Sequence, residues 1–125
     1  WKPVMNLRSI LLNLQSLLHE YPIVNEPMYN SLDVNNIKSL NYNKVLTYHN
    51  YKFAILEMLK KNDYYPFFKD IKIKYFYENL DKYIKNLEEL NNKLNNTEVK
   101  IFPWKSTGCR LEYNKLLEEF KKLKV

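Results

Sequence analysis

The clearest pattern along the chain is a leucine-rich stretch near its start, in which apolar residues recur at positions i, i+3 and i+4. This spacing predicts an amphipathic helix over residues 7–18, with Asn6 as its N-cap. Leu12 lies on the opposite, polar face together with Ser9, Asn13 and Ser16. The stripe that we expect to be buried consists of Leu7, Ile10, Leu11, Leu14, Leu17 and Leu18.

Three further helices follow from the same periodicity. The pattern over residues 43–60 predicts the second helix. Its inner face is expected to consist of Val45, Leu46, Phe53, Leu56 and Leu59. Pro66 is suited to the first position of a third helix that extends to residue 94, and its length predicts a break or bend near Tyr77. Its core positions are Phe67, Phe68, Ile71, Tyr75, Phe76, Leu80, Tyr83, Ile84, Leu87, Leu90 and Leu94. The fourth helix spans 110–124, with Leu116, Leu117, Phe120 and Leu123 facing inward.

The segments between these helices predict loops. Pro22 and Pro27 indicate an extended connection over 21–29, and the asparagine-rich stretch 30–41 reads as a surface loop. Residues 97–108 contain the single glycine of the chain and are also expected to be a loop. With one glycine and five prolines the chain has few sites for tight hairpins, so the expected fold class is mainly α with about four helices.

Size and composition limit the class of protein. A chain of 125 residues with 46% hydrophobic residues can form one domain with a modest core. Its one cysteine cannot form an internal disulfide, which favours a reducing compartment such as the cytoplasm or nucleus. No apolar run approaches the roughly 18–20 residues that span a bilayer, so we expect no membrane association.

The residue pattern predicts no catalytic residue, metal site or cofactor. The glutamate pairs at 88–89 and 118–119 are adjacent on helices and diverge by about 100°, so they read as solvated faces. His19, His49 and Cys109 are isolated from one another in the sequence, whereas zinc needs about four ligands in short pairs. A chain with a single glycine cannot build a phosphate loop.

Cys109 is the one candidate nucleophile. Lys105, Arg110 and a following helix N-terminus are features that activate a thiol. An unreactive thiol near a helix start is nevertheless the favoured interpretation.

The charge balance raises nucleic-acid binding as an alternative. Twenty Lys and Arg against fourteen Asp and Glu give a net charge of +6, and residues 69–85 interleave lysines with aromatics. Those aromatics also fall at helical core spacing, and the lysines are dispersed among acidic residues. We therefore expect no nucleic-acid partner.

The first thirty residues resemble a known family. The sequence WKPVMNLRSILLNLQSLL (1–18) resembles the segment that follows the catalytic cysteine of ubiquitin-conjugating enzymes. PIVNEPMYN (22–30) resembles the variant found in the giant inhibitor-of-apoptosis-type subgroup, and 53–61 and 67–77 resemble its later helices. The resemblance implies that residues 1–96 are the helical C-terminal part of an α+β conjugating domain, with 97–125 as a loop and helical extension.

The resemblance also implies a function. The family transfers ubiquitin or a ubiquitin-like protein from a cysteine thioester to lysine, and its cysteine, His-Pro-Asn motif and sheet precede the tryptophan that matches Trp1. This chain would then supply partner-positioning helices without the catalytic cysteine, so that an enzyme assignment stays open. The alternative is a non-enzymatic helical interaction scaffold with a vestigial resemblance.

Two sets of partner-facing residues follow from the matched positions. Those matching the surface that meets the thioester-linked ubiquitin are Ser9, Leu12 and Ser16, and those matching the loop that ligases touch are Lys2, Pro3 and Val4. The implied partners are ubiquitin or a ubiquitin-like protein, a ligase and an activating enzyme. An isolated exposed leucine, or one covered by another helix of this chain, is the alternative interpretation of Leu12.

Overall fold

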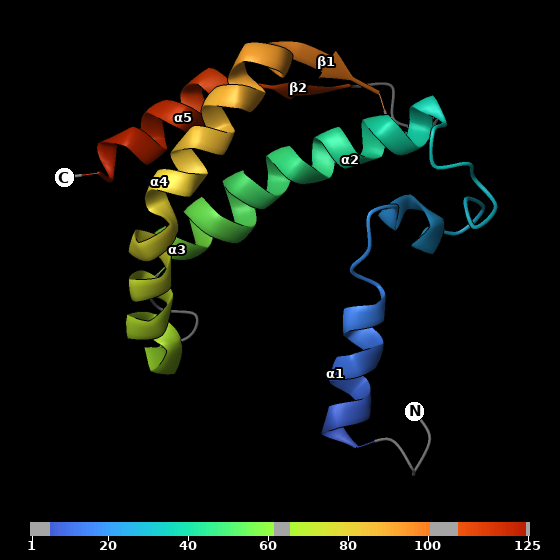
Figure 1. Ribbon diagram of the computed structural model, residues 1–125, viewed down its shortest axis with the longest axis horizontal. Helices are drawn as coiled ribbons and strands as arrows, with labels where there is room; N and C mark the ends of the chain where they lie inside the picture. Colours follow the sequence, from blue (N-terminus) through green and yellow to red (C-terminus); the bar gives the residue numbers. More distant parts are fainter. Residues whose placement is uncertain (1–5, 62–65, 101–107, 125) are drawn as a thin grey trace. The chain divides into compact units, whose positions relative to one another are not determined.

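The computed structural model describes residues 6–61, 66–100 and 108–124 (Figure 1). The chain divides into two compact units, Trp1–Asn43 and Lys44–Val125, which are considered separately. The structure is mainly helical with one small sheet, which confirms the predicted fold class.

The first unit begins with helix α1, Leu7–Ser16. Its start is fixed by a capping box, because the Asn6 side chain accepts a hydrogen bond from the Ser9 amide and the Ser9 hydroxyl accepts one from the Asn6 amide. A short 3-10 helix η1, Pro22–Asn25, lies in the predicted connection. The Asn25 side chain donates to the Leu17 carbonyl at 3.0 Å and so fixes the exit from α1.

The predicted burial of the α1 stripe is wrong for the described part of the chain. No residue of α1 is buried, and the exposed fractions of Leu11 and Leu14 are 56% and 55%. The buried residues of this unit lie instead further along the chain, at Ile23, Tyr29 and Ser39. The helix therefore forms as the periodicity predicts, but its apolar face stays exposed within this unit.

The second predicted helix begins earlier than expected and consists of three consecutive helical segments, α2, η2 and α3, here called the rod. Helix α2, Ile37–His49, starts within the stretch that reads as a loop, because the Asn36 side chain accepts from the Lys38 amide and caps it. The rod continues through a π-helix η2, Asn50–Glu57, into the short helix α3, Met58–Lys60. The wider turns of η2 change the face that each residue presents. Consequently Tyr51 packs against the core, whereas Phe53, a predicted core residue, stays 50% exposed. Tyr48, which precedes η2 in α2, is buried as well.

The third predicted helix forms as one long element. A 3-10 turn η3, Pro66–Phe68, leads into α4, Lys69–Leu94, and no break interrupts α4 near Tyr77. Its C-terminal part supplies the predicted core residues Phe76, Leu80, Ile84 and Leu87. The prediction that the apolar residues of η3 and the first turns of α4 are buried is wrong, because the elements packed on α4 do not cover them. These residues are Phe67, Phe68, Ile71 and Tyr75.

A small sheet and a final helix complete the second unit. Strands β1, Thr97–Val99, and β2, Cys109–Leu111, pair antiparallel, with Val99 opposite Cys109. Asn96 turns the chain into β1 with a positive φ of 57°, which Asn tolerates better than most residues. Helix α5, Tyr113–Lys122, therefore begins three residues later than predicted, because 110 and 111 belong to β2.

The core of the second unit forms where α4, α5 and the η2 segment meet. Leu116, Leu117 and Phe120 of α5 are buried, as the sequence predicts. The Phe120 ring lies 5.8 Å from that of Phe76 and 6.1 Å from that of Tyr51, measured between centroids. Such contacts between aromatic rings stabilise the core beyond the free energy gained by burying the area of the rings.

Candidate functional site

The outward residues predicted from the family resemblance lie together on α1. Ser9, Leu12 and Ser16 are spaced three and four residues apart and therefore share one helix face. Leu12 is 55% exposed, which is close to the exposure of Leu14 on the opposite face. Exposure alone thus does not distinguish Leu12 from the leucines that the sequence places inside.

The two serines have local roles in α1. The Ser9 hydroxyl donates to the Asn6 carbonyl at 2.8 Å, and the Ser16 hydroxyl donates to the Asn13 carbonyl at 2.7 Å. Both hydroxyls can still accept a hydrogen bond from a partner. Lys2, Pro3 and Val4, the predicted ligase-facing residues, lie outside the described residues.

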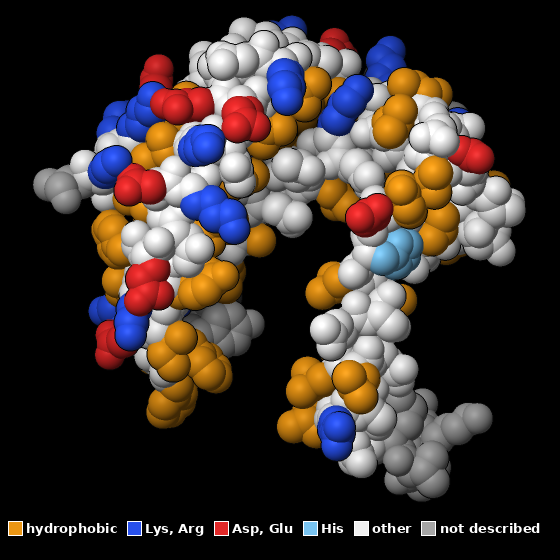
Figure 2. Space-filling model, viewed as in Figure 1, with side chains coloured by type: hydrophobic (Ala, Val, Ile, Leu, Met, Phe, Trp, Pro, Cys, Tyr) orange, Lys and Arg blue, Asp and Glu red, His pale blue; other side chains and the backbone are white. Residues whose placement is uncertain are grey.

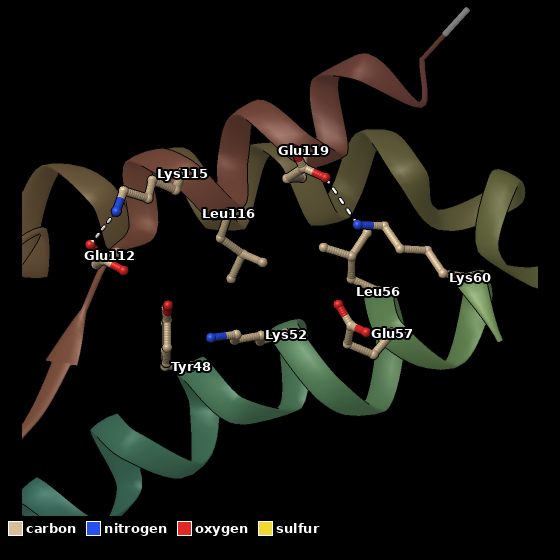
Figure 3. Close-up of a pocket in the computed structure, with 9 residues that line it drawn as sticks. All are labelled: Tyr48, Lys52, Leu56, Glu57, Lys60, Glu112, Lys115, Leu116 and Glu119. Atoms are coloured by element: carbon tan, nitrogen blue, oxygen red, sulfur yellow. Dashed lines mark hydrogen bonds and ion pairs between the residues drawn. The ribbon is translucent and has the colours of Figure 1, made fainter.

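A charged cleft of about 240 Å³ opens between the α2–η2–α3 rod and α5 (Figure 3). Its apolar floor includes Leu56 and Leu116. Charged side chains surround this floor. Lys60 of α3 pairs with Glu119 of α5 across the rim at 3.0 Å, whereas Lys115 pairs with Glu112 at 2.6 Å on the α5 side alone. The remaining lining residues are Tyr48, Lys52 and Glu57.

The electrostatics of this cleft favour binding rather than acid–base chemistry. The hydrogen bond from Lys115 lowers the pKa of Glu112, and that from Lys60 lowers the pKa of Glu119, so both carboxylates are ionised at neutral pH. A carboxylate with a lowered pKa is a poor general acid. The Lys52 amine lies over the rings of Tyr48 and Phe53, at 5.8 and 5.3 Å from their centroids.

An apolar groove of about 200 Å³ lies on the other side of the rod, against α4. The Lys72 amine lies in this groove and donates to the Met58 carbonyl of α3 at 2.6 Å. Its lining residues are Ala54, Ile55, Met58, Lys72, Tyr75, Phe76 and Tyr83. No side chain in this groove is a nucleophile at neutral pH.

The basic residues of α4 and α5 alternate with acidic ones, and Figure 2 shows blue and red side chains interspersed over this part of the molecule. Lys124 pairs with Asp81 at 2.6 Å, and Lys121 pairs with Glu88 at 2.7 Å. These bridges tie the end of α5 to α4. Lysines on this face therefore alternate with carboxylates, and those named above are paired with them.

The structure brings together two residues that are isolated in the sequence. The Cys109 sulfur lies 3.7 Å from Nε2 of His49, and both residues are partly buried. Sixty positions separate them along the chain, so no local motif could have revealed the pair. Cys109 also lies in β2 rather than at a helix start, which removes one of the two activating features expected from the sequence.

The described residues show neither a metal cluster nor a membrane helix. No three His, Cys, Asp or Glu side chains gather closely enough within these ranges to hold a metal ion. Among the helices of the described segments, none is long and apolar enough to cross a bilayer.

Comparison with known proteins supports the family resemblance at a coarse level. No family model matches the chain. Over 60 residues the chain is 35% identical to ubiquitin-conjugating enzyme E2 Z of Xenopus tropicalis, and this match covers 48% of the chain but 19% of that enzyme. The chain thus spans about one-fifth of the length of the curated relative, and the match supports a relationship to ubiquitin-conjugating enzymes in general.

Proposed function

We propose that the chain is the helical C-terminal part of a ubiquitin-conjugating domain. In the complete polypeptide it positions ubiquitin or a ubiquitin-like protein during transfer from a cysteine thioester to lysine. The similarity to the frog enzyme supports the class, and the Asn25-Glu26-Pro27 sequence after α1 suggests the inhibitor-of-apoptosis-type subgroup.

The observation that carries this proposal is the uncovered α1 helix. Figure 2 shows hydrophobic side chains along it, and none of its residues is buried. A stripe of exposed leucines on a well-capped helix indicates a contact with a partner or with another part of the polypeptide. In the family a sheet precedes this helix in the sequence, and we propose that this sheet covers Ile10 and Leu14. The face with Ser9, Leu12 and Ser16 then stays available to ubiquitin.

The nucleophile of the proposed transfer lies ahead of Trp1 in the complete polypeptide, as the family pattern implies. Cys109 is not that residue, since the family's cysteine comes before the tryptophan. The helices of this chain act by positioning the bound ubiquitin, because holding two reactants in a productive geometry accelerates their reaction.

The test separates loading of the cysteine from discharge. The complete enzyme is charged with ubiquitin and then followed in single turnover with free lysine as acceptor. We expect Leu12→Asp to leave loading nearly unchanged and to slow discharge by up to about a hundredfold, the equivalent of burying one leucine at roughly 1.5–3 kcal/mol. Asn92→Asp is the control, because it places the same charge at an exposed helical position in the other unit.

Two outcomes would contradict the proposal. Equal discharge rates for the wild type and Leu12→Asp would remove the assignment of the outward face to ubiquitin. A complete polypeptide that the activating enzyme cannot charge would instead favour the non-enzymatic scaffold.

A further inference from the structure

We propose that Cys109 and His49 form a reactive thiol–imidazole pair, and that Cys109 is a site of reversible modification by low-molecular-weight disulfides. This inference does not depend on the proposed conjugating function. A thiol next to an imidazole is the arrangement that activates cysteine as a nucleophile, because the ring accepts the thiol proton and its charge then stabilises the thiolate. The distance of 3.7 Å between Sγ and Nε2 lies within hydrogen-bonding reach of a sulfur atom.

The fold holds both members of the pair in place. Pairing of β1 with β2 fixes Cys109 opposite Val99, whose side chain is buried. The His49 ring ends α2 and packs 5.2 Å from the Phe53 ring and 5.8 Å from the Tyr48 ring. Both residues of the pair remain partly exposed, so a small disulfide can reach the sulfur.

A buried tyrosine, Tyr113, packs with its ring 5.2 Å from that of Tyr48, whose ring in turn lies 5.8 Å from that of His49. Tyr113 is fully buried, and its hydroxyl has no hydrogen-bond partner among the described residues. Burial raises the pKa of Tyr113 to about 12, with smaller contributions from Tyr51, Tyr48 and Cys109, so the hydroxyl keeps its proton at neutral pH.

The charged groups on the segments around the pair are mixed, with cations in excess. Arg110 follows Cys109 directly in β2, and Glu98 lies across the sheet from Arg110. Burial raises the pKa of Tyr48, and Cys109, Glu112 and Lys115 also act on this hydroxyl. The charged residues on these segments include Lys52, Glu98, Lys100, Arg110, Glu112 and Lys115. Lys115 is paired with Glu112 at 2.6 Å, so the charge that stabilises the proposed thiolate is that of His49.

The proposed reaction is thiol–disulfide exchange. The Cys109 thiol transfers its proton to Nε2 of His49, and the thiolate attacks one sulfur of the disulfide. A new S–S bond forms while the original S–S bond breaks, and the leaving thiolate takes the electron pair. It then takes up a proton from the imidazolium or from water. A second thiol reverses the modification by the same exchange.

The first test follows the rate of reaction with dithiodipyridine, measured by thiopyridone release, as a function of pH. At pH 6 we expect the wild type to react about tenfold faster than His49→Gln, because the thiolate fraction rises more than its nucleophilicity falls. Near pH 10 both proteins are thiolates, and the wild type should be slower by roughly two- to fivefold, since the less basic thiolate is the weaker nucleophile. His19→Gln, at an exposed position in the other unit, should follow the wild type throughout.

This crossing of the two rate profiles distinguishes an activated thiol from one that has merely become more accessible, which would react faster at every pH. Identical profiles for the wild type and His49→Gln would overturn the proposal.

A second measurement leaves the packed histidine in place. The His49 imidazole is titrated by NMR in the wild type and in Cys109→Ser, and we expect its protonated form to persist to higher pH in the wild type. Coincident titrations would show that the two groups are not coupled.

In parallel, glutathione disulfide should add one glutathionyl group to the folded wild type, removable by dithiothreitol. An adduct that forms only on denatured protein would also contradict the proposal.

Discussion

The different surroundings of two leucines give the sharpest test of this structure. Leu14 in α1 and Leu116 in α5 both fall on the apolar stripe of an amphipathic helix, and from sequence alone both belong to the core. The structure separates them, because Leu116 is 4% exposed and Leu14 is 55% exposed. Replacing each by alanine is the same chemical change in two different environments.

The expected costs follow from burial. Leu116→Ala removes buried side-chain atoms from between α5 and the α2–η2–α3 rod and leaves a cavity, which costs about 2–5 kcal/mol in the free energy of unfolding. Leu14 keeps more than half of its surface in water, so Leu14→Ala can lose less than half of the roughly 1.5–3 kcal/mol that full burial of a leucine contributes. Alanine is also the better helix former, which offsets part of that loss. We therefore expect Leu14→Ala to cost less than about 1 kcal/mol.

The assay is denaturant unfolding followed by circular dichroism, with amide hydrogen exchange to resolve α1 from α5. Exchange is needed because the chain has two compact units, whose opening can be measured separately only with local probes. A Leu14→Ala loss in this chain as large as that of Leu116→Ala would refute the reasoning. On the proposed function, a sheet from an upstream segment covers α1, and the cost of Leu14→Ala in a polypeptide that includes this sheet should rise to about 2–5 kcal/mol.

Three further predictions concern single residues. Phe120→Ala should cost about 3–5 kcal/mol in the free energy of unfolding, whereas Phe53→Ala, at a half-exposed position, should cost less than about 1 kcal/mol; equal losses would contradict the change of face caused by η2. Burial and the Glu26 hydrogen bond raise the pKa of Tyr42 from 10.0 to about 12, so its contribution to stability is complete below pH about 10 and is lost as pH rises through about 12. In chemical unfolding over this alkaline range, the free energy of unfolding of Tyr42→Phe should therefore fall less than that of the wild type. If the two free energies fall in parallel with pH, the raised pKa of Tyr42 is contradicted. On the proposed conjugating function, Cys109→Ser in the complete polypeptide should load ubiquitin normally in a thioester gel assay, and loss of charging with an intact fold would assign the transfer chemistry to this thiol.

The sequence determined the local elements wherever one dominant periodicity acts. The helix at α1, the inner faces of α5 and of the C-terminal part of α4, and the core position of Phe120 follow directly from i, i+3 and i+4 spacing. These predictions hold because helix formation depends on neighbouring residues, and an apolar stripe on a helix with a packed neighbour has one favourable orientation. The relationship to ubiquitin-conjugating enzymes was likewise visible in the leucine-rich motif.

Only the tertiary structure decided which apolar stripes are covered and which distant groups meet. Periodicity shows that a helix has an apolar face, but burial depends on whether another element reaches that face, as the difference between Leu14 and Leu116 shows. The β1–β2 pairing joins strands that are separated along the chain, so no local signal specifies it. The tertiary structure also brings Cys109 of β2 to 3.7 Å from His49 of α2, sixty positions away along the chain.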